Sequence, residues 1–358
     1  MKSIILILTS WLLITQSVLA ERNETLAAGG EYSNILTRIA FGSCAKEYKP
    51  QPILEKVAEN KPDLFVFLGD NMYGDTSDED VLQNKYSQFG SKPEFRALLN
   101  ATDVIATWDD HDYGKNNAGR HFPFKEKSKE IFLDFWREPL ISDRRKRKGI
   151  YADYMFGSEG KRVQILLLDT RSFRDDYKQR LVRKIRHSKI SAYKRIYVEH
   201  SDKARTMLGK QQWRWLEEQL RKPADLRIIG SSTQFGVSHN GHEAWANMPH
   251  EQKKLANIIS STGANGVVFI SGDMHYSETS RLKTDVTYPL YDFTSSGITQ
   301  TTFHAFANKN RIDGPIMQNN YGMLEIDWAK QVIRFKVIDL SGEETINRLV
   351  SMSELVFK

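Results

Sequence analysis

Six short apolar runs, each bounded by turn-forming residues, constrain the fold of this chain more than any other feature. They lie at 38–42, 64–69, 103–108, 163–168, 226–230 and 266–271. Runs this short and continuous are typical of strands that are buried on both faces by helices. Helical segments alternate with them at 52–60, 79–88, 125–136, 210–221 and 249–261, and late strands are expected at 321–327 and 331–338. The alternation predicts an α/β fold, in which a β-sheet core is covered by helices.

The first twenty residues have the pattern of a signal peptide. Lys2 precedes an apolar stretch at 4–14, and Val18-Leu19-Ala20 supplies small residues before an expected cleavage after Ala20. A membrane anchor is the alternative, but the apolar run is short for a bilayer span. We therefore expect a secreted or periplasmic protein in which 1–20 is the signal peptide and 21–358 is a single domain. Hydrophobic residues make up 40% of the chain, which suits a packed globule.

Basic residues are unevenly distributed in a chain whose formal charge is +6. One basic run lies at 144–148 and a longer one at 178–205. Both are consistent with solvated surface loops, or with a basic lip that attracts anionic substrates or phospholipid headgroups. Neither run contains a nucleic-acid-binding motif, and no protein partner is inferred.

Polar side chains of unusual variety follow the predicted strands. Cys44, which is the only cysteine, follows the first strand, and "GDNMYGD", "TWDDHDYGKNN", "LDTRSFR" and "SGDMH" follow four others. Ligands of open α/β sheets bind beyond the carboxyl ends of the strands. A lone Gly-Asp is usually a turn, and an Asp-His pair is often only a hydrogen-bonded pair. The repetition of metal-binding groups at successive strand ends instead indicates a metal centre.

The mixture of ligand types indicates two different metal ions. Carboxylate and amide oxygens suit Ca²⁺, Mg²⁺ or Mn²⁺, whereas imidazole, phenolate and thiolate suit a more polarising transition metal. Two sites bridged by one carboxylate explain the set better than either site alone. Such a pair can generate hydroxide from bound water and hold both oxygens of a displacement at phosphorus. This chemistry predicts phosphoester hydrolysis.

These motifs, together with "LGKQQWRWLEEQL", resemble those of the PhoD-type alkaline phosphatases, which are relatives of the calcineurin-like metallophosphoesterases. The resemblance runs in order from about residue 38 to 340. It implies a layered metallophosphoesterase-type fold with the metal site at the strand carboxyl ends. Many members carry a β-rich domain before the Gly-Ser-Cys motif. Only 23 residues separate Ala20 from Cys44, so we expect that domain to be missing here.

The resemblance also implies roles for individual residues. A ferric ion would be held by Cys44, Asp70 and Tyr73. Asp273 and His275 match the metal-binding aspartate and histidine of the family's Gly-Asp-x-His block. One or two Ca²⁺ ions would use Asp70, either Asp109 or Asp110, and Asn116, with other divalent metals as possible replacements. Asp110, His111 and Arg171 are the expected catalytic residues, and Asn117 is an expected substrate contact beside Arg171. Cys44 would take the place of the Asp-x-His motif with which ordinary metallophosphoesterases begin.

Several alternatives stay open at the level of sequence. A phosphoesterase of mono- or diesters is favoured, and a phospholipase C-like variant would meet lipid headgroups through Trp245 at the rim of the site. Trp245 could equally be buried in a packed loop. A cysteine hydrolase would use Cys44 with His111 or His275 as its base, and a non-catalytic binding protein would retain only the fold. Arg171 could also brace its loop by pairing with Asp169 or Asp175.

Overall fold

The computed structural model describes residues 26–186 and 189–358, and two large β-sheets form the centre of this part of the chain. The six-stranded sheet has the order β16-β15-β14-β2-β3-β4. Its strands span Glu344–Ser351, Val332–Asp339, Asn320–Asp327, Arg38–Gly42, Leu64–Leu68 and Asp103–Thr107. β2, β3 and β4 are parallel to one another, whereas β14 is antiparallel to β2. The carboxyl ends of these three parallel strands therefore share one edge.

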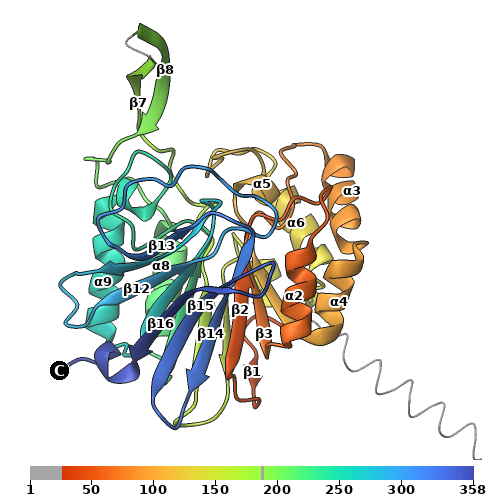
Figure 1. Cartoon of the computed structure of the whole chain (residues 1–358), viewed down its shortest axis with the longest axis vertical. Coiled ribbons are helices and arrows are strands. Elements are labelled where there is room, and N and C mark those ends of the chain that lie inside the picture. The colour runs from red at the N-terminus through yellow and green to blue at the C-terminus, as the bar shows by residue number, and fades with distance from the viewer. Residues whose placement is uncertain (1–25, 187–188) are drawn as a thin grey trace, which may run out of the picture.

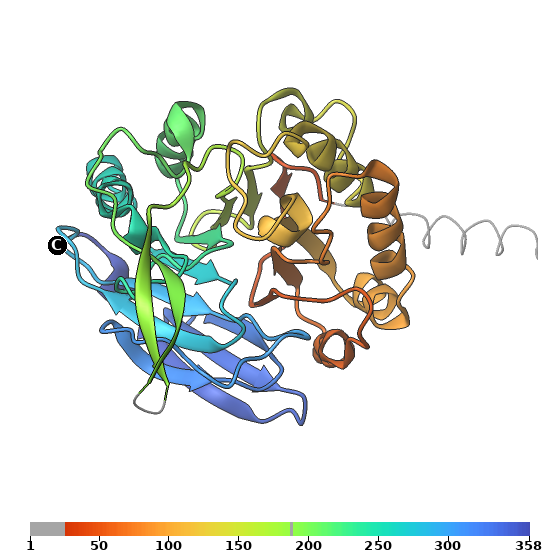
Figure 2. The same cartoon turned by 90° about the horizontal axis from the view of Figure 1, so that it is seen from above.

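The second sheet has eight strands in the order β1-β5-β6-β9-β10-β12-β11-β13. They span Glu31–Tyr32, Ala152–Phe156, Val163–Leu167, Leu226–Ser231, Val267–Ser271, Leu290–Thr294, Ser277–Leu282 and Arg311–Ile316. β6, β9, β10 and β12 are parallel neighbours. Their carboxyl ends form a second shared edge, and the polar loops of both sheets meet at the same end of the molecule (Figures 1 and 2).

Helices cover the outer faces of the two sheets, as Figure 2 shows. On the side of the six-stranded sheet lie α2 (Pro52–Asn60), α3 (Glu79–Gly90), α4 (Pro93–Ala101) and α6 (Lys125–Phe135). On the other side lie α8 (Gly209–Leu220) and α9 (Pro249–Thr262). Short helical turns at α5 (Asp110–Tyr113), α7 (Asp143–Lys146), η1 (Trp245–Asn247) and η2 (Met352–Leu355) complete the set. Proline begins α2, α4 and α9, where its missing N–H is not needed.

The core has two layers because the central strands are buried on both faces. In β3, Leu64, Val66 and Leu68 belong to the large cluster between the sheets. Phe65 and Phe67 of the same strand pack in the cluster beneath the helices. Side chains alternate between the two faces of a strand, so one continuous apolar run contributes residues to both layers of the core. This is the arrangement that the continuous apolar runs predicted.

The predicted helix-covered β-core is confirmed, with the difference that it consists of two sheets and not one. The six early strands and the five predicted helices lie where expected, within a few residues. The long basic region at 178–205 contains a hairpin, β7 (Gln179–Arg186) and β8 (Lys189–Tyr197), that projects from the body (Figure 1). None of the helices in the described part of the chain combines the length and apolar character needed to cross a bilayer. The predicted signal peptide lies outside the described residues.

Candidate metal centre at the strand ends

The polar residues of the predicted motifs meet where the carboxyl edges of the two sheets come together. Cys44 follows β2 and Asp70 follows β3, both in the six-stranded sheet. His275 follows β10 and Ser296 follows β12 in the eight-stranded sheet. The Sγ atom of Cys44 lies 3.1 Å from Oγ of Ser296, across the junction of the sheets. The site is therefore built from both sheets.

The first group of side chains surrounds the thiol. Ligand atoms of Cys44, Asp70 and His275 all lie within 4.8 Å of one another. The Tyr73 hydroxyl lies 3.2 Å from Nε2 of His275. Ser296 accepts a hydrogen bond from the backbone N–H of His275 at 2.8 Å and also contacts the thiol. Thiol, phenol, imidazole and carboxylate are thus gathered in one place.

The second group shares Asp70 with the first. Ligand atoms of Asp70, Asp110 and His111 also lie within 4.8 Å of one another. The imidazole of His111 stacks on the ring of Tyr73, with 4.1 Å between ring centres. Its Nδ1 lies 2.7 Å from Oδ1 of Asp75. One carboxylate, that of Asp70, therefore belongs both to a group with a thiol and to a group with a second carboxylate.

Backbone strain is concentrated at these residues. Nine non-glycine residues in the described part of the chain have positive φ, and six of them belong to this region: Cys44, Asp70, Asp75, Asn117, Asp273 and His275. Left-handed φ is unfavourable for residues with a Cβ and persists where the surroundings enforce it. Such strain clusters at active and ligand sites. The tight turns after β2, β3 and β10 thus aim these side chains into the junction of the sheets.

Gly69 makes one of these turns possible. Its φ is +98°, and a Cβ at this position would lie 2.5 Å from the backbone N of Asp109. Only glycine fits both the backbone conformation and the space. The loops after β3 and β4 can therefore approach each other, which brings Asp70 next to Asp110.

Arg171 lies beside the second group and is completely buried. Its Nε donates to Oδ1 of Asp109 at 2.5 Å, and its Nη1 donates to Oε1 of Glu243 at 2.7 Å. Its Nη2 lies 3.8 Å from Oδ1 of Asp110 and has no hydrogen-bond partner among the described residues. The guanidinium of Arg171 pairs with Asp109 and Glu243, whereas Asp169, one of the two bracing partners that the sequence had suggested, accepts only the backbone N–H of Arg171 at 3.0 Å. One of its donors is left free.

Burial of several acids together perturbs their ionisation. Desolvation, and then the charges of Asp110 and Cys44, raise the pKa of Asp70 well above its usual value. Desolvation and the charge of Asp109 do the same to Asp273. Asp110 is the exception, because Arg171 and His111 outweigh its burial and lower its pKa. Acids packed this closely need either protons or a cation.

The pKa shifts of Cys44 and His275 favour the neutral form of each side chain. Burial raises the pKa of the Cys44 thiol to about 12. Burial, together with the charges of His111 and Lys46, lowers the pKa of His275 to about 4. His111 differs: burial opposes its charged form, yet the hydrogen bond to Asp75 and the charge of Asp110 raise its pKa. A neutral His275 has a lone pair for a metal, while His111 holds its proton more tightly than an ordinary histidine does.

Buried oxygen atoms without partners test whether cations would fit here. Oδ2 of Asp109, Oδ1 of Asp110 and Oδ2 of Asp273 have no hydrogen-bond partner among the described residues. Leaving charged oxygens buried and unpaired is costly, so such atoms require an explanation. A bound cation satisfies them, and the oxygen, nitrogen and sulfur donors on the page are those that metal ions use. The residues fit a metal centre.

Three predicted residues are placed differently from the rest. Asn116 and Asn117 are exposed on the loop after α5, and only Asn117 is tied to the centre, through its backbone N–H to Oδ2 of Asp110 at 2.5 Å. Trp245 is completely buried and donates to Oγ of Ser231 at 3.0 Å. The expectation of Trp245 at the rim of the site is therefore wrong, because the indole fills the core beside Phe235. The packed-loop alternative describes it.

Sequence reasoning missed several residues that shape the centre. Ser296 follows a strand, β12, that was not predicted. Glu243 stands in the loop where only Trp245 was considered. Asp112 accepts hydrogen bonds from the backbone N–H of Asp109 at 2.6 Å and the side chain of Asn71 at 2.6 Å, which positions both loops. The signal for Asp112 was present, since it is the third carboxylate of the Asp-Asp-His-Asp block.

Comparisons with known proteins show what the chain is similar to. A family model described as PhoD-like phosphatase matches residues 39–331. Alkaline phosphatase D of Bacillus subtilis (strain 168) is 26% identical over 302 residues, which cover 74% of this chain and 50% of the relative. The chain thus spans about half the length of that curated relative.

Two solved structures resemble the fold. PhoD has a TM-score of 0.68 and 18% identity, covering 90% of this chain and 70% of that one. GAP50, the anchor in the inner membrane complex of Plasmodium, has a TM-score of 0.54 and 13% identity, covering 91% and 90%. At these identities the structural matches establish the fold alone.

Proposed function

The chain belongs to the PhoD-like phosphatase family, and we propose that it is a metal-dependent phosphoesterase that hydrolyses phosphate monoesters, phosphodiesters or both. The observation that carries the proposal is the shared position of Asp70. This carboxylate belongs at once to a group with a thiol and an imidazole and to a group with a second carboxylate. A bridging carboxylate between two unlike donor sets is the arrangement that a two-metal phosphoesterase needs.

Two kinds of cation suit the two groups. Cys44, Tyr73, His275, Asp273 and the shared Asp70 would hold a transition metal ion, for which we propose Fe³⁺. Asp70 and a carboxylate after β4 would hold one or two Ca²⁺ ions, with Asn116 as a further ligand. When bound, these ions would polarise a phosphate oxygen and lower the pKa of water, which supplies the nucleophile.

The geometry favours Asp110 over Asp109 as the carboxylate after β4 that faces the shared metal position. Asp110 lies in the group with Asp70, and its Oδ1 is free. Oδ1 of Asp109 already accepts from Arg171 and from Oγ of Ser232 at 2.6 Å. We therefore propose that Asp109 mainly orients Arg171, although its Oδ2 stays available.

Two side chains of the protein would act on the phosphate ester itself. Arg171 would donate its free Nη2 to a non-bridging phosphate oxygen, which stabilises the negative charge of the transition state. His111 would give a proton to the departing oxygen, since its hydrogen bond with Asp75 favours the protonated ring. Asn117 is a candidate for a further contact with the substrate at the exposed mouth of the centre.

The cysteine-hydrolase alternative is poorly supported. The Cys44 thiol contacts the side chains of Ser43, Asp70 and Ser296, and no histidine among the described residues is hydrogen-bonded to it. The thiol is buried, and its raised pKa disfavours the thiolate that a nucleophile needs. A metal ion would reverse that preference, because a coordinated thiol is deprotonated. The thiol is better suited to bind a metal than to attack a substrate.

The place of action and the natural substrate are further parts of the proposal. The pattern of residues 1–20 supports a secreted or periplasmic protein. The phospholipase C-like variant loses the residue that suggested it, because Trp245 is buried. We therefore propose phosphate esters in general as substrates, without a requirement for a lipid surface.

Metal analysis combined with two substitutions tests the proposal. A ferric phenolate absorbs visible light, so the purified protein should be coloured, and Tyr73→Phe should lose the colour while staying folded. Cys44→Ser should lose the transition metal and most phosphoesterase activity, because a hydroxyl is a poor substitute for a thiolate. Tyr86→Phe is the matched control, since Tyr86 is buried in α3 and its hydroxyl has no partner among the described residues. A colourless, fully active enzyme that contains only zinc would refute the assignment.

A further inference from the structure

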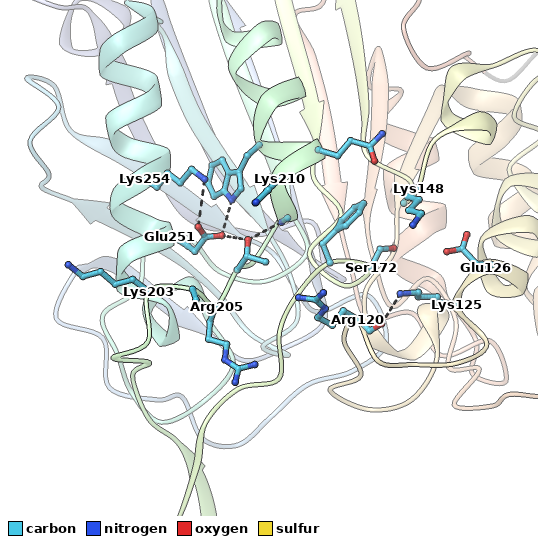
Figure 3. Close-up of a pocket in the computed structure, with 17 residues that line it drawn as sticks. Arg120, Lys125, Glu126, Lys148, Ser172, Lys203, Arg205, Lys210, Glu251 and Lys254 are labelled. Atoms are coloured by element: carbon cyan, nitrogen blue, oxygen red, sulfur yellow. Dashed lines mark hydrogen bonds and ion pairs between the residues drawn. The ribbon is translucent and has the colours of Figure 1, made fainter.

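A large basic pocket lies next to the candidate centre and is not part of it. Its volume is about 780 Å³, within the range of small-molecule sites. Seven basic side chains line it, and Figure 3 shows them on opposite sides of the opening: Arg120, Lys125, Lys148, Lys203, Arg205, Lys210 and Lys254. Glu126 and Glu251 are the two acidic residues in its lining. The pocket therefore has a strong excess of positive charge.

Some of the basic side chains in the pocket form no ion pair with an acidic residue of the protein. Glu251 accepts hydrogen bonds from Thr206, from the backbone of Met207 and from Trp213, all at 2.7–2.8 Å. Arg120 and Arg205 share Asp175. Lys148, Lys203 and Lys210 form no ion pair within the described residues. Repulsion among them is offset when an anion enters the pocket.

Neutral donors face the same space. α8 begins at the pocket with Gly209, and neither a side-chain cap nor an acidic residue occupies its first turn. The first N–H groups of a helix have no partner within it and carry partial positive charge, which favours anions. Ser172 lies on the opposite wall, is 9% exposed, and its hydroxyl has no hydrogen-bond partner in the described structure. Its hydroxyl is a further donor on the wall of the pocket (Figure 3).

Two loops separate the pocket from the candidate centre and contribute to both. The loop after β6 places Arg171 against Asp109 in the centre, while its next residues, Ser172 and Phe173, line the pocket. The loop after α5 ties Asn117 to Asp110 and then supplies Arg120 to the pocket. The two sites are therefore neighbours that share the same two loops.

We propose that this pocket binds a second anionic group of the substrate, a phosphate or a similar oxyanion that is not itself hydrolysed. This inference rests on the proposed phosphoesterase function and narrows its substrate class to esters that carry more than one negative group. Lysine and arginine side chains, the amides of α8 and Ser172 provide the donors that a tetrahedral oxyanion accepts from.

The test uses a pair of substrates that differ by one phosphate. Thymidine 5′-(p-nitrophenyl phosphate) has only the scissile phosphate, whereas its 3′-phosphorylated form has a second one, and both release p-nitrophenol. The pocket variant carries Lys148→Gln, Lys203→Gln and Lys210→Gln. The control variant carries Lys161→Gln, Lys283→Gln and Lys358→Gln, which removes the same charge from exposed positions outside the pocket. Melting temperatures establish that all three proteins fold equally well.

We expect the pocket variant to raise KM for the 3′-phosphorylated substrate by about tenfold, with kcat within about twofold, because charge–charge attraction between the lost lysines and the second phosphate disappears. KM for the substrate without the second phosphate should not change, and the control variant should behave as the unmodified protein. Equal effects of both variants on both substrates would overturn the proposal, since they would show only a general charge effect.

A binding measurement tests anion binding by the pocket independently of catalysis. Sucrose octasulfate is a polyanion without a phosphoester bond, and its binding can be followed by calorimetry. We expect it to bind the unmodified and control proteins and to bind the pocket variant at least about tenfold more weakly. This result with no turnover of either nucleotide would refute the phosphoesterase and not the anion pocket. Equal binding to all three proteins, or binding to none, would overturn the pocket.

Discussion

At the scale of single residues, Arg171 best shows how structure changes the meaning of a motif. The "DTR" block suggested either a phosphate contact or a loop brace. In the structure the guanidinium is held on two sides, by Asp109 and Glu243, and its third nitrogen is free beside Asp110. The two ion pairs fix the direction of the free donor. The same residue therefore combines an internal brace with a donor that is available to a ligand.

Arg171→Lys separates these roles. Lysine keeps the charge but loses the planar fork, so it can pair with one carboxylate or contact phosphate but not both. We expect turnover to fall on the order of 10²-fold, as for the loss of one oxyanion donor, and phosphate inhibition to weaken, while the metal content is unchanged. Arg227→Lys is the control, because Arg227 is also buried but donates to carbonyl groups away from the centre. Normal turnover of Arg171→Lys with full metal content would exclude Arg171 from the active site.

Asp292 gives a prediction about pH. It is fully buried on β12, where burial outweighs three hydrogen bonds and raises its pKa to about 6. The unfolded value is near 3.9. The folded protein therefore holds the proton of Asp292 more tightly than the unfolded chain does. The contribution of this group to stability is highest below about pH 4 and is lost as pH rises through about 6, by a total of about 3 kcal/mol.

Asp292→Asn should remove this part of the pH dependence. The amide oxygen can accept from the N–H groups of Phe235 and Gly236, and the amide NH₂ can donate to Ser271. We expect the difference in melting temperature between pH 5 and pH 8 to become smaller than in the unmodified protein. Asp285→Asn is the control, because its carboxylate is exposed. An unchanged difference between the two pH values would show that Asp292 does not titrate in this range.

At the scale of elements, the β7–β8 hairpin stands apart from the body of the protein (Figure 1). Its base is tied by the N–H of Tyr197 to the carbonyl of Gly241 at 2.9 Å, and Tyr197 packs on Tyr177. Arg180 pairs with Ile196 in the ladder above this base. A two-residue Asn-Gly turn can therefore join these two residues and replace 181–195 without changing the strand register.

We expect this shortened protein to have a free energy of unfolding within ~1 kcal/mol of the full chain, because the base contacts are kept and an isolated two-stranded ribbon adds little stability. Chemical denaturation measures this value. Turnover of a small substrate such as p-nitrophenyl phosphate should also be unchanged. A large loss of stability would show that the outer part of the hairpin packs on the body. Loss of turnover alone would place it in substrate binding.

The sequence predicted those strands whose buried residues are also apolar. β3 is apolar at every position, and it was found at Leu64–Leu68. β11 was missed because it reads Ser-Glu-Thr-Ser-Arg-Leu, although its first four residues are buried. Glu278 in this strand is satisfied by Arg311 and Gln234 from distant segments. A sequence cannot show such partners, and Ser296 beyond the neighbouring β12 was lost for the same reason.

The candidate site also has a part that the sequence could predict and a part that it could not. Cys44, Asp70 and His275 could be predicted because each stands just after an apolar strand, and parallel strands end at a common edge. The division of labour between Asp109 and Asp110 could not, because it depends on which of two adjacent carboxylates faces Arg171. That choice is fixed by α5 and by the hydrogen bond from Asp109 to Asp112.

At the scale of the whole molecule, the metal centre should contribute to stability. Asp109, Asp110 and Asp273 each have a buried carboxylate oxygen without a hydrogen-bond partner among the described residues, which a cation would satisfy. A ligand that binds only the folded state stabilises it. We expect removal of metal by a chelator to lower the melting temperature by about 5 °C or more and to abolish activity, and added Ca²⁺ to restore both at least in part. Chelator saturated with Ca²⁺ is the control. An unchanged melting temperature with retained activity would contradict a metal centre.

The pairing of β2 with β14 has a consequence for the newly made chain. Cys44 leaves the ribosome long before Ser296, which contacts its thiol from a position 252 residues later, and β14 comes later still. At typical speeds of about 5–20 residues per second, roughly 10 to 50 s pass before Ser296 has even been synthesised. The lone thiol is therefore chemically unprotected during its own translation. If Cys44 is the metal ligand proposed above, oxidation of its thiol during this interval would lower the fraction of the protein that can bind the transition metal.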